Sequence, residues 1–418
     1  MNLKNFAIIL AFISLELKVF SSPIKDILSQ DELTAVEISD SEISTEEIVT
    51  IRIDENSILE DDDNSDSEWE ASEVNNNGED IYNLPCNDIN DCIDWLGANL
   101  DIANLFINPK LSTEDIQYMR EHYKDTEILQ QKYDAINYGK KVEVNGLQMS
   151  VNIMGEENEK TIVLLPGLGI FNPVIYYKNI TESLSTDFRV VIIEPFGYGL
   201  SDLTKKERTV QNIVGEIHEC LDKLGIKQFY LMGHSIGGIY AFAYDNTYKG
   251  EMLGFIGIDN TSNFEIPVSM DYPEIFFTVI SIFDKYHMYK ILPEEVKNQL
   301  IPLDMELQYQ NYTEQEIEIL NTIYLYKSNN KNIMKEYELM SVNIAATKDL
   351  YFQCPALMFI ASDTIESSKS MNIDLEQLYM DMIVDNPNSE VITLEGVHRY
   401  LHSQNKEVMV KKIKEWIN

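Results

Sequence analysis

Residues 229–240 read Phe-Tyr-Leu-Met-Gly-His-Ser-Ile-Gly-Gly-Ile-Tyr. The apolar start of this stretch predicts a buried strand, and the residues after Gly237 predict a helix. The Gly-x-Ser-x-Gly pattern between them predicts a nucleophile elbow, a tight turn that holds Ser235 above the edge of a sheet. Gly233 and Gly237 flank the serine because a Cβ at either position would collide across the turn. A serine at the start of a helix also lies beside free N–H groups that favour negative charge.

Strands and helices alternate along the chain on both sides of this turn. An Asn-Gly pair at 145–146 predicts a β-hairpin over residues 142–151. Further patterns predict strands at 161–165, 190–193, 255–258, 356–360 and 391–394, and helices at 176–184, 210–224 and 405–416. This alternation is typical of an α/β fold with a mostly parallel central sheet and helices on both faces. Sites in such folds lie at the carboxyl ends of the strands.

The first part of the chain resembles a targeting segment followed by an acidic one. Lys4 and the apolar run at 6–15 predict a signal peptide over residues 1–21. The run is shorter than the ~20 residues that a membrane-spanning helix needs, and an uncleaved anchor is the alternative. Residues 22–80 are strongly acidic and predict a disordered segment, for which calcium or matrix binding is the functional alternative. We therefore expect a chain of the secretory pathway, secreted or lumenal.

Two further segments complete the predicted domain organisation. Ser112 and Asp115 predict a capped helix start within an N-terminal helical segment, residues 81–138, which we expect to pack on the main domain. The α/β domain is predicted over residues 139–418. Its alternation of strands and helices stops for about ninety residues, and such a long insert predicts a helical cap at about 264–352.

The composition restricts the possible partners. The net charge of −38 and the pI of ≈ 4.4 argue against nucleic acid or an anionic membrane surface. The spacing of His and Cys residues predicts no metal site, and no motif predicts a cofactor. We expect a small-molecule substrate and no stable membrane insertion once the signal peptide is removed. The oligomeric state stays open.

The four cysteines and the glycosylation sequons bear on the compartment. Cys86 and Cys92 are close enough for a local disulfide in an oxidising lumen. Cys220 and Cys354 lie in segments that predict buried free thiols. In a secreted chain, glycans would be accepted at the sequons of Asn179, Asn260 and Asn311.

Four segments in a fixed order carry a resemblance to a known family. They are residues 166–169, 194–201, 233–237 and 396–398. From about residue 142 to the C-terminus, the chain resembles the α/β-hydrolase fold superfamily, in its branch with a serine nucleophile and a helical cap. The resemblance implies that Ser235 is the nucleophile. Dehalogenases and epoxide hydrolases of this fold need an aspartate at this position, so the resemblance does not extend to their chemistry.

The resemblance also implies a base and an acid. His398 follows the last predicted strand, where the family places its catalytic histidine, and His402 is the alternative. Asp363 follows the strand at 356–360 and is the expected acid. Asp259, before the insert, is the rival and is expected to be structural. Surface or core positions are expected for the remaining histidines in helical context, His122, His218 and His287.

Backbone donors are needed for the negative charge of a tetrahedral intermediate. By resemblance, the N–H groups of Leu168 and Ile236 form this oxyanion hole. Pro166 departs from the family pattern, in which His often precedes the glycine, and Glu194 stands where many relatives have Asp. We expect Glu194 to be structural. We expect His234 to pack in the core, because an elbow directs its side chain away from the serine hydroxyl.

These residues predict a serine hydrolase that cleaves an ester-type or related acyl substrate through a Ser-His-Asp triad and an acyl-enzyme. An acyltransferase or an aminopeptidase with the same triad is the enzymatic alternative. An aminopeptidase would need a cap carboxylate for the substrate amine, and Glu274, Asp284 and Glu294 are candidates. A non-catalytic ligand-binding protein of the same fold is the third reading.

Overall fold

The computed structural model describes most of the chain from residue 85 onward. The described residues are 85–104, 111–123, 125–263, 279, 282–283, 286, 288–291, 312–327, 330–370, 373–383 and 386–418. The predicted signal peptide at 1–21 and the acidic segment at 22–80 lie outside the described residues. So does most of the first half of the predicted cap, including His287 and the three candidate cap carboxylates.

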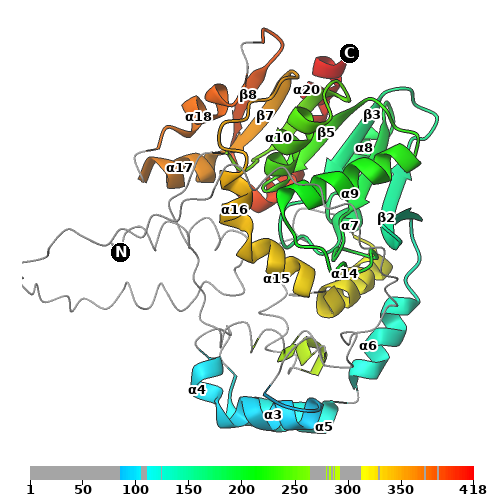
Figure 1. Cartoon of the computed structure of the whole chain (residues 1–418), viewed down its shortest axis with the longest axis vertical. Helices are drawn as coiled ribbons and strands as arrows, with labels where there is room; N and C mark the ends of the chain where they lie inside the picture. Colours follow the sequence, from blue (N-terminus) through cyan, green and yellow to red (C-terminus); the bar gives the residue numbers. More distant parts are fainter. Residues whose placement is uncertain are drawn as a thin grey trace, which may run out of the picture. The chain divides into compact units, whose positions relative to one another are not determined.

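An eight-stranded sheet in the order β1-β2-β4-β3-β5-β6-β7-β8 forms the centre of the α/β domain (Figure 1). The β1–β2 hairpin (Lys140–Val144 and Leu147–Met154) pairs antiparallel with β4, and all other neighbouring strands are parallel. Asn145 and Gly146 form its turn with φ of 51° and 75°, which confirms the Asn-Gly prediction. The remaining strands are β3 (Thr161–Leu165), β4 (Arg189–Glu194), β5 (Phe229–His234), β6 (Met252–Ile258), β7 (Ala356–Ala361) and β8 (Glu390–Leu394).

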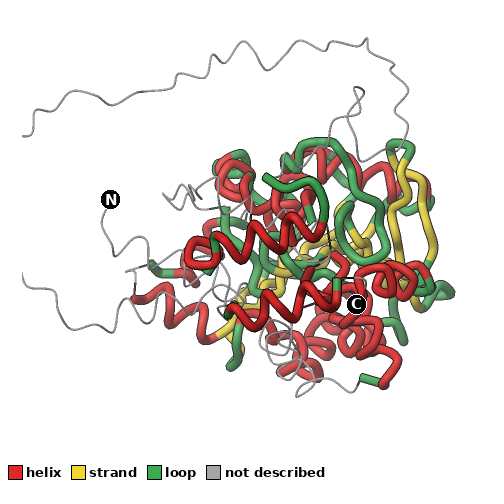
Figure 2. The backbone as a smooth tube through the Cα atoms, turned by 90° about the horizontal axis from the view of Figure 1, so that it is seen from below, coloured by secondary structure: helices red, strands yellow, loops and turns green. Residues whose placement is uncertain are grey.

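Each buried strand supplies side chains to two separate cores, because neighbouring side chains on a strand point to opposite faces. Val163 and Leu165 belong to the core with α9 (Val210–Lys223), α10 (Gly237–Thr247) and α18 (Leu375–Asp381). Ile162 and Leu164 belong to the core with α8 (Lys178–Leu184), α19 (Leu401–Gln404) and α20 (Lys406–Ile417). Helices therefore lie on both sides of the strands (Figure 2). The predicted α/β fold with a mostly parallel sheet is confirmed.

The predicted helix at 176–184 is in fact two helices, α7 (Pro173–Tyr176) and α8. Asn172 starts α7 by accepting a hydrogen bond from the Ile175 N–H, and Pro173 occupies its first turn. Tyr177 breaks the helix with φ −95° and ψ 10°. The break matters for the site because the Tyr177 side chain is fully buried beneath the loop that follows β3.

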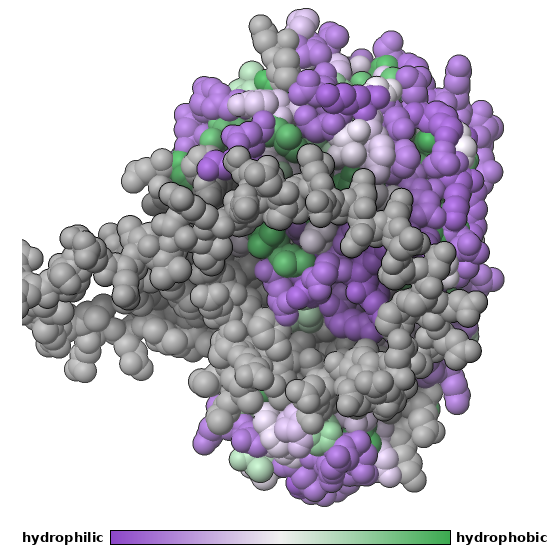
Figure 3. All heavy atoms as spheres, viewed as in Figure 1, coloured by the Kyte–Doolittle hydropathy of each residue, from purple (hydrophilic) through white to green (hydrophobic). Residues whose placement is uncertain are grey.

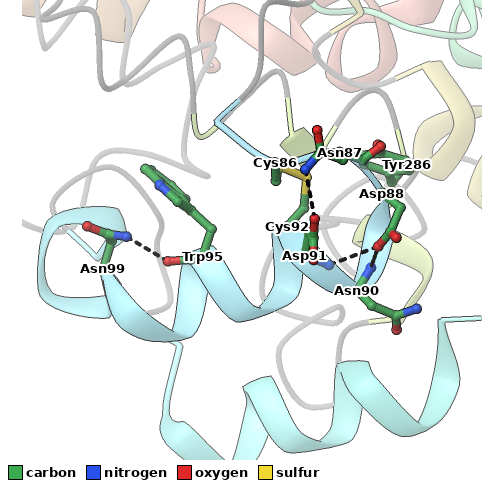
Figure 4. Close-up of a disulfide and its surroundings, with 9 residues drawn as sticks. All are labelled: Cys86, Asn87, Asp88, Asn90, Asp91, Cys92, Trp95, Asn99 and Tyr286. Atoms are coloured by element: carbon green, nitrogen blue, oxygen red, sulfur yellow. Dashed lines mark hydrogen bonds between the residues drawn. A yellow bond between two sulfur atoms is a disulfide. The ribbon is translucent and has the colours of Figure 1, made fainter.

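The described residues of the N-terminal segment contain four helices: α3 (Ile89–Ala98), α4 (Leu100–Ala103), α5 (Thr113–His122) and α6 (Asp125–Asp134). The predicted capping box is present, since Ser112 and Asp115 each accept a hydrogen bond from the other's backbone N–H. Cys86 and Cys92 are joined by the predicted disulfide at the start of α3 (Figure 4). The Asp88 side chain caps α3 by accepting from the N–H groups of Asn90 and Asp91.

This segment packs on the part of the predicted main domain that forms the insert. Its apolar side chains share a core with residues of the insert, among them Ile282, Phe283 and Met288. Helix α6 contacts α14 (Glu314–Lys327) of the insert, where Tyr133 stacks on Tyr326 with ring centroids 3.9 Å apart. The segment thus extends the cap region.

The second half of the predicted cap consists of α14, α15 (Lys331–Glu338) and α16 (Met340–Ala345), preceded by the short 3₁₀ helix η2 (Met288–Ile291). Hydrophilic residues cover most of the described surface in Figure 3. The helices of the described part of the chain include none that is both long and apolar enough to cross a bilayer.

The predictions for the remaining cysteines are confirmed, whereas one of the predicted glycan acceptors is wrong. Cys220 and Cys354 are buried free thiols, as predicted. Asn179 is partly exposed on α8, and Asn311 lies outside the described residues. Asn260 is only 2% exposed and lies against Gly238 and Gly257, so it has no room for a glycan in the folded chain. For Asn260 the prediction of a glycan acceptor is wrong.

Candidate active site

The turn between β5 and α10 is the predicted elbow. Ser235 has φ 51°, a left-handed conformation that is costly for a residue with a Cβ and that often marks functional sites. A Cβ on Gly233 would lie 2.9 Å from the Gly237 carbonyl carbon, and one on Gly237 would lie 3.1 Å from the Leu165 oxygen. Gly233 is therefore required by close approach across the turn, whereas Gly237 packs tightly against the end of β3. Ser235 itself is 6% exposed.

The loop after β3 packs directly against this elbow. A Cβ on Gly167 would lie 3.2 Å from the Ser235 Cβ and 2.9 Å from His234 Nδ1. Leu168 follows in this loop, and Ile236 is the N-cap residue of α10. Within the described part of the chain, neither backbone N–H donates to a protein acceptor. The two predicted oxyanion donors thus lie on the two loops that meet at Ser235.

His398 lies on the loop after β8, at the start of the 3₁₀ helix η3 (His398–Tyr400). Its Nδ1 lies 2.5 Å from Asp259 Oδ2, and the Asp259 side chain is fully buried. Because a carboxylate oxygen accepts, Nδ1 carries the proton and donates, which leaves Nε2 as the acceptor. The His398 ring is 4.9 Å from the ring of His234, the residue before Ser235. The structure therefore brings the imidazole and the serine into one neighbourhood.

Asp259 follows β6, the strand beside β5. It has φ 40°, and this rare conformation coincides with a carboxylate that is held from several sides. Oδ1 accepts from the Ala361 N–H at 2.8 Å, and Oδ2 accepts from Thr364 Oγ1 at 2.5 Å as well as from His398. The Asp259 carboxylate is thus held by the neighbouring strand β7 and by the helix that follows it.

The sequence predicted that Asp363 contacts the imidazole, and in the structure Asp259 makes that contact. Helix α17 (Ser362–Ser370) begins directly after β7, so Asp363 lies in its first turn. Its carboxylate accepts from the backbone N–H of His398 at 3.1 and 3.3 Å instead of from the ring. Burial and the nearby charge of Asp259 raise the pKa of Asp363. The rival in the sequence, Asp259, is the residue that contacts the ring.

His234 does more than fill space. Its Nε2 lies 3.2 Å from the His398 carbonyl oxygen, and its Nδ1 lies 2.8 Å from the Tyr177 hydroxyl. Burial, with the nearby His398 and His402, lowers the pKa of His234 well below its ordinary value. The sequence had given this residue a packing role only. The signal for the additional role was its position directly before the serine.

The other described histidines take no part in the contact with Asp259. His402 is fully buried, and its Nε2 lies 3.3 Å from the Tyr176 carbonyl oxygen. Burial lowers the pKa of His402 to about 4. His122 stacks on Tyr118, and His218 stacks on Tyr248. Of the described histidines, His398 is the one beside a buried carboxylate and the elbow together.

Comparison with known proteins identifies the family of this chain. The family model described as the alpha/beta hydrolase fold matches residues 160–402. The chain belongs to this family. The match covers the elbow, Asp259 and His398 together, and it extends over the loop after β3.

Individual relatives are more distant. The chain is 30% identical over 122 residues to the uncharacterized protein YbdG of Bacillus subtilis (strain 168), which covers 29% of this chain and 37% of YbdG. It is 32% identical over 96 residues to 3-oxoadipate enol-lactonase 1 of Acinetobacter baylyi, covering 23% of this chain and 35% of the lactonase. The matches thus span little more than a third of the length of these relatives. The epoxide hydrolase VrEH1 of Vigna radiata superposes with a TM-score of 0.51 at 18% identity, covering 67% of this chain and 97% of VrEH1.

Glu194 of this α/β hydrolase is a buried structural carboxylate, in agreement with its predicted role. It is fully buried and accepts hydrogen bonds from the Tyr138 hydroxyl and the Leu200 N–H, each at 2.8 Å. Gly199, with φ 48°, lies so close that a Cβ there would overlap the Glu194 carboxylate. Burial raises the pKa of Glu194. In the described residues no group of three His, Cys, Asp or Glu side chains is arranged to hold a metal ion.

Proposed function

We propose that this protein is a serine hydrolase that cleaves an ester-type or related acyl substrate through Ser235, His398 and Asp259. The observation that carries the proposal is the buried pair of His398 Nδ1 and Asp259 Oδ2, at 2.5 Å, beside a serine in a left-handed backbone conformation. A serine hydroxyl becomes a nucleophile when a neighbouring base takes its proton, and an oriented imidazole whose Nε2 carries no proton is such a base.

The first half of the reaction forms an acyl-enzyme. Ser235 Oγ attacks the substrate carbonyl carbon while His398 Nε2 takes the hydroxyl proton. The negative charge that develops on the carbonyl oxygen is stabilised by the N–H groups of Leu168 and Ile236 and by the start of α10. The intermediate then breaks its bond to the leaving group, which receives the proton from His398. Asp259 stabilises the imidazolium throughout.

The second half returns the enzyme to its starting state. Water donates a proton to His398 Nε2 and attacks the acyl carbon, which forms a second tetrahedral intermediate. Its collapse breaks the bond to Ser235 Oγ, releases the acid, and returns the proton to the serine. Atoms and charge balance without a cofactor.

Labelling with a fluorophosphonate probe tests the proposal. The folded wild-type protein should be labelled at one site, and Ser235→Ala should not be labelled. Hydrolysis of p-nitrophenyl butyrate should be lost in Ser235→Ala and strongly reduced in His398→Ala, while both variants keep the wild-type Tm within a few degrees. A wild-type protein that is folded and yet neither labelled nor active on a panel of acyl esters would refute the hydrolase and favour the binding protein. Added alcohol as acceptor separates hydrolysis from acyl transfer.

We also propose that the chain enters the secretory pathway. The Cys86–Cys92 disulfide supports this, because such bonds persist in oxidising compartments and are rare in the cytosol. Expression with and without residues 1–21 tests it: the full chain should appear in the secretory fraction, and the shortened chain should not.

A further inference from the structure

His398 lies on a loop, and the backbone around it is held by side chains from other strands. Its N–H donates to Asp363, at the start of the helix after β7. Its carbonyl oxygen accepts from His234, at the end of β5. The ring itself donates to Asp259, after β6. The three side chains that hold His398 thus come from the ends of β5, β6 and β7, which lie side by side in the sheet, although His398 itself follows β8.

The hydrogen bonds of His234 also reach the loop after β3, which contains Gly167 and Leu168 and is called the oxyanion loop below. A carbonyl oxygen only accepts, so His234 Nε2 carries the proton and donates to His398. The buried ring is neutral, which leaves Nδ1 as an acceptor for the Tyr177 hydroxyl at 2.8 Å. The Tyr177 oxygen in turn accepts from the Gly167 N–H at 3.3 Å. A directed chain of hydrogen bonds therefore runs from Gly167 through Tyr177 and His234 to the backbone of His398.

The side chains in this series of hydrogen bonds are buried away from water. Tyr177 is 0% exposed and His234 is 1% exposed, so each donor and acceptor has a protein partner in place of solvent. Losing one partner of a buried pair leaves the other group unsatisfied, and that cost favours one arrangement of both loops. Gly167 directly precedes Leu168, the expected oxyanion donor. The two ends of the chain are therefore the loop of the oxyanion hole and the loop of the base.

We propose that His234, with Tyr177, is a positioning residue that fixes the backbone of His398 relative to the oxyanion loop. The inference rests on the proposed function, since it assigns the two loops their roles in acyl chemistry. The His234 ring does not exchange protons in the reaction: it stays neutral, donates to one loop and accepts a hydrogen bond from the hydroxyl held by the other. Its effect is on the approach of the base to the serine, so it acts on the chemical step more than on substrate binding.

Three variants test this role. His234→Phe keeps a ring and removes both hydrogen bonds, His234→Gln keeps a side-chain N–H and C=O, and Tyr177→Phe removes one hydroxyl. The matched control is His402→Phe, the same change at a buried histidine whose Nε2 pairs with the Tyr176 carbonyl and not with His398. The probes are a fluorophosphonate, for the labelling rate constant between pH 5 and 9, and p-nitrophenyl butyrate, for kcat and KM. Tm is measured for every variant.

His234→Phe should lower kcat and the labelling rate by roughly ten- to a hundredfold while KM changes little, as expected for a misplacement of the order of 1 Å. The pH of half-maximal labelling should move, because displacing the imidazole changes its distances from the carboxylates of Asp259 and Asp363. In the part of the chain that the structure describes, the titratable or charged groups around His398 include these two carboxylates, His234 and the adjacent Arg399. His234→Gln should recover most of the rate, and Tyr177→Phe should lose less than His234→Phe.

An effect of packing alone predicts a different pattern. If His234→Phe and His402→Phe slow labelling by the same factor at a similar loss of Tm, or if His234→Phe leaves the rate and pH midpoint unchanged, the positioning role is wrong. If His234→Phe does not fold, Tyr177→Phe decides: an unchanged rate in that variant overturns the inference. A labelled wild type with unaffected variants overturns only this inference, whereas an unlabelled wild type overturns the proposed function.

Discussion

Two aspartates compete for the role of the triad acid, and one pair of isosteric substitutions separates them. Asp259→Asn keeps the shape of the side chain but replaces one acceptor oxygen with an NH₂ group. The Ala361 N–H needs an oxygen at Oδ1, so the new NH₂ faces Thr364 and His398. It then donates to His398 Nδ1, which moves the ring proton to Nε2 and removes the lone pair that accepts the serine proton.

The expected loss in kcat is large. A triad acid changed to its amide loses on the order of 10⁴-fold through this change of tautomer, or about 5.5 kcal/mol of transition-state stabilisation. Asp363→Asn is the matched control, because its remaining oxygen still accepts the His398 N–H. A hydrogen bond to a neutral amide is weaker than one to a carboxylate by about 1 kcal/mol, so we expect only about a fivefold loss.

The assay is kcat/KM for p-nitrophenyl butyrate over pH 5–9, with Tm for both variants. Similar Tm values are expected, so that the difference in rate reflects the site. A larger loss in Asp363→Asn than in Asp259→Asn would refute the assignment of Asp259 and restore the acid position expected from the family resemblance.

Three further predictions concern stability. The first concerns pH. Burial lowers the pKa of His402 from its ordinary value of 6.5 to about 4, so between these pH values the unfolded state binds more protons than the folded state. The free energy of unfolding should therefore fall on acidification through this range, by up to about 3 kcal/mol. Urea unfolding at pH 7 and pH 4.5 should reveal this loss in the wild type and a smaller loss in His402→Gln. An equal difference in the free energy of unfolding between the two pH values in both proteins would contradict the prediction. Secondly, Gly199→Ala should lower the free energy of unfolding by roughly 2–4 kcal/mol, because the new Cβ overlaps the buried Glu194 carboxylate. Gly225→Ala is its control, with φ 70° and nothing within 4 Å, and should cost only about 1 kcal/mol; equal losses would show that backbone strain alone is responsible. Thirdly, Cys86→Ser with Cys92→Ser opens the short loop that this disulfide closes and should destabilise the start of α3 by about 2 kcal/mol. Hydrogen exchange should then be faster in α3 than in wild type and unchanged in β5, and unchanged exchange in α3 would oppose this reading.

Local patterns were enough to predict much of the fold. Strand β3 was predicted with its observed bounds, and the elbow, the Asn145–Gly146 turn and the capping box at Ser112 all occur where the sequence indicated. These features depend on residues close together in the chain: alternation or apolar runs for strands, and glycine where φ is positive or backbones meet. Such determinants can be read from the sequence without knowledge of the tertiary fold.

Some features depended on how distant segments meet. Asp259 and Asp363 both follow predicted strands, and nothing local distinguishes them. Asp259 reaches the ring because β6 lies between β5 and β7, whereas Asp363 is drawn into the first turn of α17. The contacts of His234, and the shared core of the N-terminal helices and the insert, have the same origin.

The strands and the position of the serine turn could thus be predicted from short stretches of residues, because both depend on backbone geometry within a few positions. The identity of the carboxylate that faces His398 became clear only in the folded chain, because it depends on strand order and on the buried hydrogen-bond partners that remain when the sheet is assembled.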